Sequence, residues 1–279
     1  MRDQEVLSAL DAALQEHPAL RELLLFYREI YQVQFALKAA LPPATCPVDD
    51  AEAARRLEAG RPLLEFHHLG LTPEGFAESL AALSQVLAVH NPSWQGVCDA
   101  FPPEALVEEA RRQFENREAL CTVTSVCAMG VTLALVPYVQ RAADAVRPLV
   151  REDLWRRGIC PLCGGWPQFA FLERETGARR LYCARCDTSW GFDRVTCPFC
   201  GEVDAMVYYP SEDGVYRLYA CEACRRYLKT MDLRRTLRTP EPLVERLVTI
   251  SMDLAAQEKG YGFGSTPVVA DANAWKEQR

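Results

Sequence analysis

Histidine is scarce in this sequence: its 279 residues include four histidines, and none lies after residue 90. Imidazole is a common ligand of zinc and other transition metals, so any metal site beyond that point must use other donors. The sequence also lacks a phosphate-binding glycine loop and the G-x-S-x-G and H-E-x-x-H motifs. Nothing in it indicates catalysis, and we predict that the protein is not an enzyme.

A secretory leader is not indicated either. Such a leader needs an apolar stretch of roughly 7–15 residues, whereas charged side chains interrupt the start of this chain, namely Arg2, Asp3, Glu5, Asp11 and Glu16. We therefore expect a cytoplasmic protein, in which cysteine thiols stay reduced. This expectation disfavours disulfides as the role of the cysteines.

The chain is rich in cysteine, and eight of its twelve cysteines form four C-x-x-C pairs. Nineteen residues separate the first pair from the second, and twenty separate the third from the fourth. This spacing is typical of a metal site built from four thiolates, and it occurs twice. The predicted ligands are Cys160, Cys163, Cys183, Cys186, Cys197, Cys200, Cys221 and Cys224.

The two halves of this segment also resemble each other outside the cysteines. The motif C-P-L-C-G recurs as C-P-F-C-G, and R-L-Y-C recurs as R-L-Y-A-C. Each half predicts a hairpin between its knuckles, turning at Thr176-Gly177 and at Asp213-Gly214. The predicted strands cover 169–172, 180–182, 206–209 and 216–219. This layout predicts two tandem rubredoxin-like or zinc-ribbon modules.

Two cysteines three positions apart can hold one side of a tetrahedral ion, and a second pair completes the shell. Four thiolates suit zinc and iron alike. They leave no open coordination position on the metal, so we expect the metal to have a structural or electron-transfer role and not to act as a Lewis-acid catalyst. The duplication favours sequential pairing of the knuckles, although a cross-braced arrangement, first with third and second with fourth, fits the same spacings. A thioredoxin-type C-x-x-C is disfavoured, because no βαβ pattern surrounds any pair.

The rest of the chain predicts helices. Residues 1–157 are rich in Ala, Leu, Glu, Gln and Arg and poor in Gly, and their apolar residues recur at helical spacing. We therefore predict an α+β protein with an all-α helical bundle domain at 1–157 and a duplicated rubredoxin-like metal-binding domain at 158–232. A C-terminal helix and tail at 233–279 should pack on these domains.

Several helix boundaries have local signals. Thr-Pro-Glu at 72–74 is typical of an N-cap and a first turn, and Pro102-Pro103 precedes an amphipathic run to about residue 120. A last helix is predicted over about 240–258, since its apolar residues lie on one face. Residues 119–140 carry no charge and are long enough to cross a bilayer. Polar residues within that run favour a central core helix, so no membrane span is expected.

The net charge of −7 disfavours a general nucleic-acid binder. Residues 151–239 have a slight excess of basic side chains, but eight thiolates with two divalent ions would bring that segment close to neutrality. A local basic patch could still form there. Its members would be Arg225, Arg226, Lys229, Arg234 and Arg235.

The remaining candidates are interpreted as structural. Four cysteines lack the spacing of ligands and are expected to pack as small apolar residues, namely Cys46, Cys98, Cys121 and Cys127. His67-His68 is framed by no cysteine or carboxylate motif. Aromatic residues beside the knuckles should form the small core around each metal, namely Trp166, Trp190, Tyr182 and Phe199.

Together these residues resemble the FdhE family of formate dehydrogenase accessory proteins, whose members join a helical N-terminal region to two rubredoxin-like knuckle pairs. The resemblance runs the length of the chain. Its most specific part is C-P-L-C-G-G-W-P at 160–167 with the three cysteine pairs that follow. Weaker similarity lies in Glu16-His17-Pro18 and at 256–261.

The resemblance implies a cytoplasmic factor needed for the assembly or activation of respiratory formate dehydrogenases, acting on the catalytic subunit before export. It also implies iron bound by the eight cysteines, which fill every ligand position of the family's motif. The expected partner is therefore the catalytic subunit of formate dehydrogenase, with no nucleic acid. The alternatives are a zinc-ribbon module that binds nucleic acid or another protein, and a redox role in which four-thiolate iron passes electrons to the immature partner.

Overall fold

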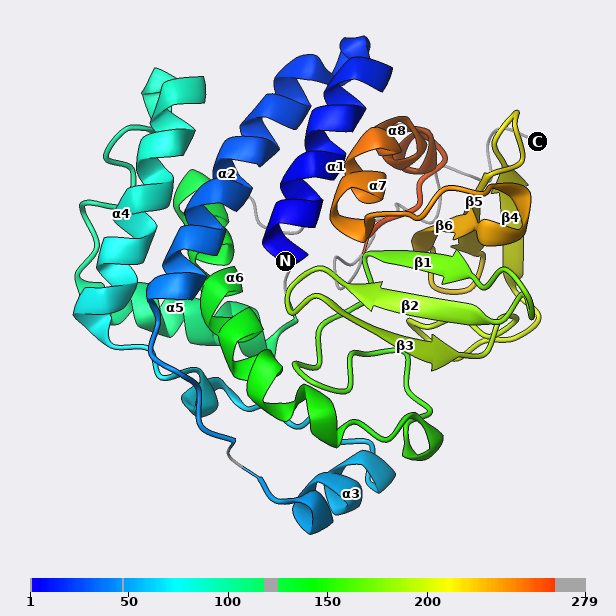
Figure 1. The fold of residues 1–279 in the computed structure, drawn as a ribbon, viewed down its shortest axis with the longest axis horizontal. Coiled ribbons are helices and arrows are strands. Elements are labelled where there is room, and N and C mark those ends of the chain that lie inside the picture. The colour runs from blue at the N-terminus through cyan, green and yellow to red at the C-terminus, as the bar shows by residue number, and fades with distance from the viewer. Residues whose placement is uncertain (1, 47, 118–124, 264–279) are drawn as a thin grey trace, which may run out of the picture.

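The computed structural model describes residues 2–46, 48–117 and 125–263, and it shows a group of helices followed by a β-sheet (Figure 1). The predicted α+β fold is confirmed. The helices before the sheet are α1 (Arg2–Glu16), α2 (Arg21–Ala40), α3 (Asp50–Glu58), α4 (Pro73–His90), α5 (Pro103–Glu115) and α6 (Val126–Val146).

Local sequence signals begin these helices as expected. The Thr72 hydroxyl accepts a hydrogen bond from the Gly75 N–H at 3.2 Å, which caps α4. Helix α5 begins at the predicted proline and is helical to Glu115, while the end of its predicted run, 118–120, lies outside the described residues. Sequence punctuation therefore locates helix starts well in this part of the chain.

Helix α6 is the central helix of the bundle and contacts α2, α4 and α5. With the turn that follows, Val126–Leu149 is long and apolar enough to cross a membrane, but most of its apolar stretch is buried inside the protein. Such burial fits the core helix predicted from the charge-free run at 119–140, whose first part lies outside the described residues.

The strands form one mixed sheet in the order β3-β2-β1-β6-β5-β4. Within each half the neighbouring strands are antiparallel, whereas β1 and β6 pair in parallel, with Ala170 opposite Thr230. The two duplicated modules therefore share a single sheet. The strands are β1 (Phe169–Leu172), β2 (Arg179–Cys183), β3 (Thr188–Phe192), β4 (Met206–Pro210), β5 (Tyr216–Cys221) and β6 (Tyr227–Asp232).

The four predicted hairpin strands are all present, as β1, β2, β4 and β5. The prediction did not include β3 and β6, which follow the second knuckle of each half. Each pairs back onto the preceding hairpin, so each half is a three-stranded meander and not a bare hairpin.

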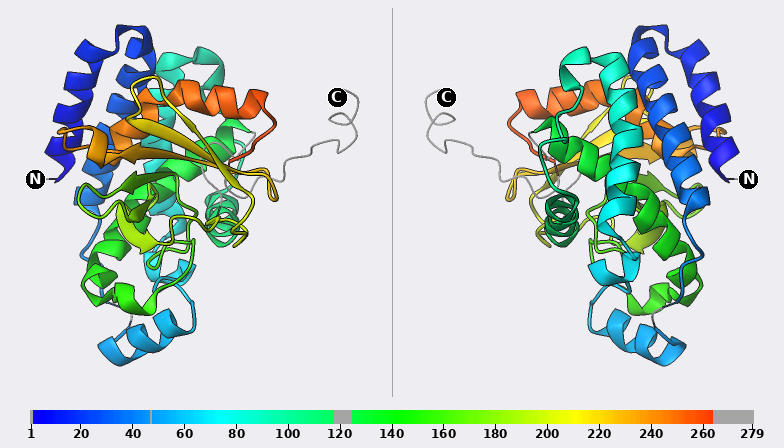
Figure 2. Two further views of the ribbon diagram at one scale, coloured as in Figure 1. Left: turned by 90° about the vertical axis from the view of Figure 1, so that its right-hand side faces the viewer. Right: turned by 90° about the vertical axis from the view of Figure 1, so that its left-hand side faces the viewer.

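The last predicted helix is two helices, α7 (Pro242–Val248) and α8 (Ile250–Glu258). Thr249 separates them with a ψ of 22°, and its hydroxyl donates to the Glu245 carbonyl at 2.7 Å. Helix α7 contacts α1, and α8 contacts β6 (Figure 2). This segment therefore contacts both the bundle and the sheet.

A polar network joins the start of the chain to the sheet and to α7. The Arg2 guanidinium donates to both carboxylate oxygens of Asp187 at 2.7 Å and to those of Glu241 at 2.7 and 3.0 Å. Asp187 also accepts a hydrogen bond from the Tyr182 hydroxyl at 2.7 Å. Asp187 directly follows a predicted ligand, Cys186, so this network fixes a cysteine knuckle against two helices.

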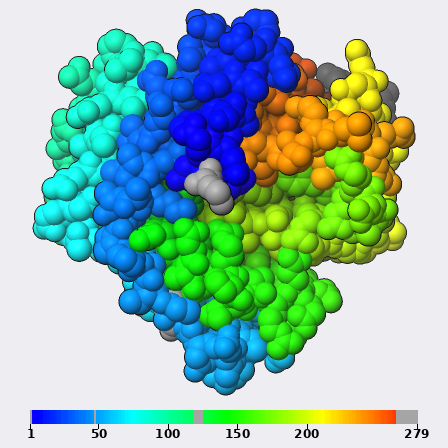
Figure 3. Space-filling model, viewed as in Figure 1, coloured from blue at the N-terminus to red at the C-terminus, as the bar shows by residue number. Residues whose placement is uncertain are grey.

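One continuous hydrophobic cluster runs from the bundle into the sheet and includes Leu10, Leu133 and Phe169. The space-filling view shows α1, in dark blue, lying against the α7 segment, in orange (Figure 3). The division of the chain into domains at 157 and 232 stays a prediction.

Candidate metal centres

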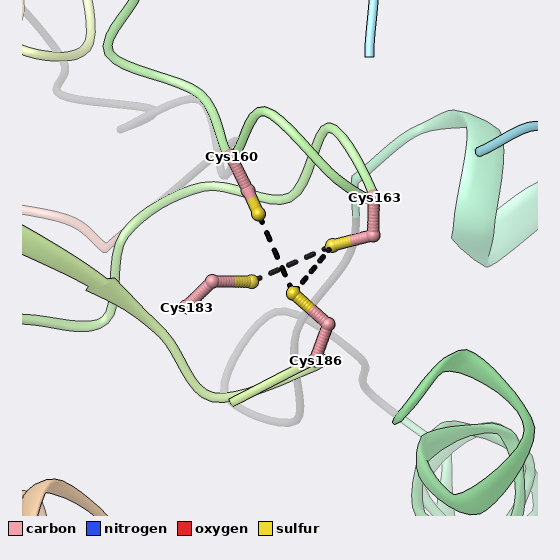
Figure 4. Close-up of side chains that lie close together, drawn as sticks. All are labelled: Cys160, Cys163, Cys183 and Cys186. Carbon is pink, nitrogen blue, oxygen red and sulfur yellow. Dashed lines mark hydrogen bonds between the residues drawn. The ribbon is translucent and has the colours of Figure 1, made fainter. Parts of the chain in front are cut away.

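The first four-cysteine cluster lies where the loop before β1 meets the turn between β2 and β3 (Figure 4). Its members are Cys160, Cys163, Cys183 and Cys186, whose sulfurs all lie within 4.8 Å of one another. The Cys160 and Cys186 sulfurs are 3.4 Å apart, and the Cys163 sulfur is 3.5 Å from those of Cys183 and Cys186. The first knuckle therefore joins the second.

The second cluster repeats this arrangement in the other half of the sheet. It joins Cys197, Cys200, Cys221 and Cys224, again with all sulfurs within 4.8 Å. The contacts between Cys197 and Cys224 and between Cys200 and Cys221 are both 3.7 Å. The cysteines are thus grouped sequentially, and the cross-braced alternative is not the arrangement that the structure shows.

The spacing of the sulfurs fits a four-thiolate metal site. Zinc–sulfur bonds of about 2.3 Å in a tetrahedron place the sulfurs roughly 3.8 Å apart, close to the observed 3.4–3.7 Å. A disulfide would need about 2.05 Å, and every cysteine in the described ranges is free. The donor set fits a closed metal shell, and the remaining sulfur pairs of each cluster also lie within 4.8 Å.

A shared backbone turn shapes the knuckles. The residue four positions after the first cysteine of each knuckle has a positive φ, namely Gly164 (69°), Asp187 (53°), Gly201 (83°) and Arg225 (55°). The Gly164 N–H donates to the Cys160 carbonyl at 3.0 Å, and the Arg225 N–H donates to the Cys221 carbonyl at 2.9 Å. Glycine adopts this conformation at little cost, but Asp187 and Arg225 show that the same turn forms without it.

The two clusters differ in their access to solvent. All four cysteines of the first cluster are at most 3% exposed. In the second cluster Cys200 is exposed and Cys224 is partly buried. Strand β4, at the edge of the sheet, and the loops near this cluster also expose several apolar side chains, namely Val195, Val203, Val207, Tyr208 and Tyr209. Solvent and chelators can therefore reach the second cluster far more easily than the first.

The electrostatics of the clusters favour a bound cation. Burial raises the pKa of Cys160 and of Cys186 well above the usual value, because a thiolate is poorly solvated there. In the second cluster the hydrogen bond with Cys224 lowers the pKa of Cys197 to about 5. Four thiolates can share so small a volume only when a metal ion neutralises part of their charge.

Two buried arginines stand beside the clusters, and sequence reasoning did not single them out. Arg185, between two cysteines of the first cluster, is 6% exposed, and its guanidinium lies 4.8 Å from the centre of the Phe114 ring. Arg179 is 1% exposed and donates to the carbonyls of Asp193 and Thr196, just before the second cluster. Burial lowers the pKa of Arg179 to about 10, so it stays charged at neutral pH. Each positive charge would offset the net negative charge that a divalent ion with four thiolates carries. Apart from the place of Arg185 inside a C-x-x-C pair, the sequence gives no signal for either.

The clusters are connected through the aromatic residues predicted beside the knuckles. The rings of Trp166 and Phe199 are 5.7 Å apart, and the Arg226 guanidinium lies 5.7 and 5.9 Å from their centres. A Cβ atom at Gly158 would lie 1.9 Å from the Pro198 carbonyl oxygen, so the chain before the first cluster contacts the second knuckle pair closely. The other two predicted aromatics, Trp190 and Tyr182, are buried.

The remaining cysteines and histidines join neither cluster in the described part of the chain. Cys46 is exposed, Cys98 is buried and Cys127 is partly buried, while Cys121 lies outside the described residues. The Nδ1 atom of His68 accepts a hydrogen bond from the Glu65 N–H at 3.0 Å, and burial lowers the pKa of His68. His68 therefore has a local structural role.

The suggested basic patch is not a free surface, because most of its side chains have partners within the protein. Lys229 is 3% exposed and donates to Asp253 at 2.6 Å. Arg225 pairs with Glu222 at 2.6 Å, and Arg234 pairs with Asp232 at 2.8 Å. Arg226 lies over the two rings described above. These contacts leave little charge for a polyanion.

Known proteins resemble this chain over most of its length. The FdhE homolog of Aquifex aeolicus is 26% identical over 271 residues, which cover 91% of this chain and 90% of that protein. The FdhE homolog of Pseudomonas aeruginosa is 31% identical over 251 residues, which cover 79% of this chain and 74% of that protein. The chain belongs to the FdhE family. The resemblance inferred from the motifs is confirmed, although no family model matches the chain.

The fold agrees with that of a solved FdhE structure. The crystal structure of the FdhE protein from Pseudomonas aeruginosa matches with a TM-score of 0.67 at 24% identity. The match covers 98% of this chain and 95% of that one. The helical region, the shared sheet and the C-terminal helices of this chain therefore form an FdhE fold.

Proposed function

We propose that this chain is a cytoplasmic accessory protein that binds the catalytic subunit of a respiratory formate dehydrogenase and is needed for that enzyme's activity. The observation that supports this most is a pair of intact four-cysteine clusters within an FdhE chain. In this proposal the chain is not itself an enzyme. It has no nucleic-acid partner, in keeping with the internally paired basic side chains, and no membrane span, in keeping with the burial of α6.

The proposed metal ligands are the eight cysteines of the two clusters, and the proposed metal is iron, with zinc as the alternative. Iron held by four thiolates supplies a one-electron couple, whereas zinc in the same shell supplies structure alone. The chain itself contributes the closed thiolate shell and the buried positive charges of Arg185 and Arg179. It also contributes the shielding of the first cluster from solvent.

Affinity capture from the native cytoplasm, with mass spectrometry of the bound proteins, tests the proposal. Three tagged proteins are compared. They are the wild type, a variant with Cys160, Cys163, Cys197 and Cys200 changed to Ser, and the control Cys46→Ser. The control removes an exposed thiol that belongs to neither cluster. It therefore separates loss of the clusters from a general loss of thiols.

The proposal predicts enrichment of a formate dehydrogenase catalytic subunit with the wild type and with Cys46→Ser, and its loss with the fourfold variant. Formate dehydrogenase activity should also disappear when the protein is absent and return when the wild type is supplied. Capture without any formate dehydrogenase subunit contradicts the proposal. Enrichment of nucleic acid or transcription proteins would support the zinc-ribbon alternative.

A further inference from the structure

A pocket of about 400 Å³ lies where the bundle, the sheet and the C-terminal helices meet. Helices α2 and α6 line it from the bundle, and α7 and α8 line it from the C-terminal segment. Strand β6 and the knuckle residues Ala184 and Arg185 complete the lining. Its volume lies within the range of small-molecule sites, about 300–1,000 Å³.

Most of the lining is apolar or aromatic. Tyr27, Tyr31 and Phe35 follow one another along α2, with ring centres 5.8 and 6.0 Å apart. Leu133 of α6 and Leu247 of α7 face the same pocket. This lining suits a ligand whose body is apolar or aromatic.

The charged side chains of the pocket leave one cation without an acidic partner. Asp253 is the acidic residue among the described lining residues, and it lies 2.6 Å from Lys229. Arg185 stands beside the thiolates of the first cluster, as described above. Arg246 remains, and no carboxylate among the described residues pairs with it.

The contacts of Arg246 are weak for a partly buried guanidinium. Its Nη2 atom donates to the Tyr31 hydroxyl at 3.2 Å, and its carbon lies 5.6 Å from the centre of the Tyr27 ring. Its Nε atom is buried and has no hydrogen-bond partner. A guanidinium that is partly removed from water and has no counter-ion is destabilised, and an anion in the pocket that accepts hydrogen bonds from its Nη atoms would offset this cost.

We propose that this pocket binds a small organic anion with an apolar or aromatic body, whose acidic group lies against Arg246. The apolar walls would cover the body of the ligand, and the guanidinium would provide charge and hydrogen bonds at one end. The site is separate from the two cysteine clusters, and the inference does not depend on the proposed function. The position of Ala184 and Arg185 between Cys183 and Cys186 does bring the pocket up to the backbone of the first cluster.

Two fluorescent probes with the same aromatic frame test this assignment. The first, 8-anilinonaphthalene-1-sulfonate, carries an acidic group, and the second, N-phenyl-1-naphthylamine, lacks it. Both are titrated against the full metal-loaded chain. Wild type should bind the sulfonate at one saturable site, at least about tenfold more tightly than the neutral probe, since a hydrogen bond between charged groups is stronger than the contacts that both probes share.

Arg246→Met should weaken sulfonate binding about tenfold or more and change the neutral probe about twofold at most, while Arg246→Lys should retain part of the difference. Arg151→Met, which removes an exposed charge that is not part of the pocket lining, is the control and should bind both probes as wild type does. Circular dichroism and thermal melting check that each variant is folded. If Arg246→Met fails to fold, the wild-type comparison decides alone. Absence of a saturable site, equal affinity for the two probes, or unchanged sulfonate binding by folded Arg246→Met would overturn the assignment.

Discussion

Gly165 packs directly against the first cluster, and its replacement by alanine gives a sharp test of the metal geometry. A Cβ atom at this position would lie 3.1 Å from the Cys183 sulfur, 3.4 Å from the Cys163 sulfur and 3.0 Å from Cδ of Arg185. Non-bonded heavy atoms are best placed roughly 3.5–4.0 Å apart. The Cys183 sulfur must therefore move by about half an ångström to accept the methyl group.

A four-thiolate shell does not tolerate that displacement well. Metal–ligand distances are expected to stay within about 0.2 Å of their ideal values, so the methyl group and an undistorted tetrahedron compete for the same space. Overpacking of this kind costs about 1–3 kcal/mol, which corresponds to roughly a 5–150-fold loss of metal affinity if it acts on the bound state alone. The loss should be confined to one of the two sites.

Equilibrium competition with a colorimetric chelator measures this loss. Gly165→Ala should give up one metal ion per chain at chelator concentrations at which the wild type keeps two. Gly191→Ala is the matched control, because its Cβ would meet only the Glu152 carboxylate at 3.5 Å, an ordinary contact. Equal retention of both metals by Gly165→Ala and wild type would refute the packing argument.

Three further predictions follow from the clusters and the sheet. A chelator in excess should remove metal in two phases, and the faster phase should come from the second cluster because Cys200 is exposed. Cys200→Ser should abolish that faster phase. A single phase in the wild type would contradict this prediction. Asp232→Asn should cost about 3 kcal/mol of unfolding free energy, because the hydrogen bond from Arg234 holds the pKa of that buried carboxyl below its usual value. The ionised Asp232 carboxylate contributes to the unfolding free energy above about pH 4, and this contribution is lost as pH falls through the lowered pKa. The difference in unfolding free energy between wild type and Asp232→Asn, measured by denaturant titration, should therefore shrink below pH 4. A difference that stays constant with pH would argue against the pairing. Changing both Cys160 and Cys163 to Ala should unfold at least half of 158–232, seen by circular dichroism, and unchanged metal content would exclude these cysteines as ligands.

Local signals explain why much of the cysteine region could be predicted from sequence. The two turns at Thr176-Gly177 and Asp213-Gly214 have residues that favour a hairpin, and the C-x-x-C spacing describes each knuckle within a few residues. The sequential grouping of the cysteines depends on the same local signals, because each hairpin brings the second knuckle of its half next to the first. Contacts of this kind depend on residues close in the chain, so one sequence is enough to infer them.

The pairing of the two halves could not be predicted in this way. Strand β6 is fully buried but contains Lys229, Thr230 and Asp232, whose charges and hydroxyl hide the apolar pattern of a central strand. Lys229 is neutralised by Asp253, and Asp232 by Arg217 and Arg234. These partners come from other elements, so the burial of β6 depends on tertiary structure.

The break between α7 and α8 has a similar origin. The helix breaks at Thr249, although the helical spacing of the apolar residues continues on both sides of it. The sequence pattern therefore does not indicate the break. The two helices contact different parts of the molecule, α1 and β6, which lie far apart in the sequence. The pocket around Arg246 likewise forms only where helices and strands that are distant in the sequence come together.

Metal analysis of the protein purified without oxygen, combined with X-ray absorption at the metal edge, tests the central claim most directly. The account predicts two metal ions per chain, each bound by four sulfurs at about 2.3 Å, with no nitrogen or oxygen ligand. Both clusters offer this shell, because their sulfurs lie within 4.8 Å of one another. Fewer than two ions per chain, or a shell that contains nitrogen or oxygen, would contradict the assignment of the two clusters as metal centres.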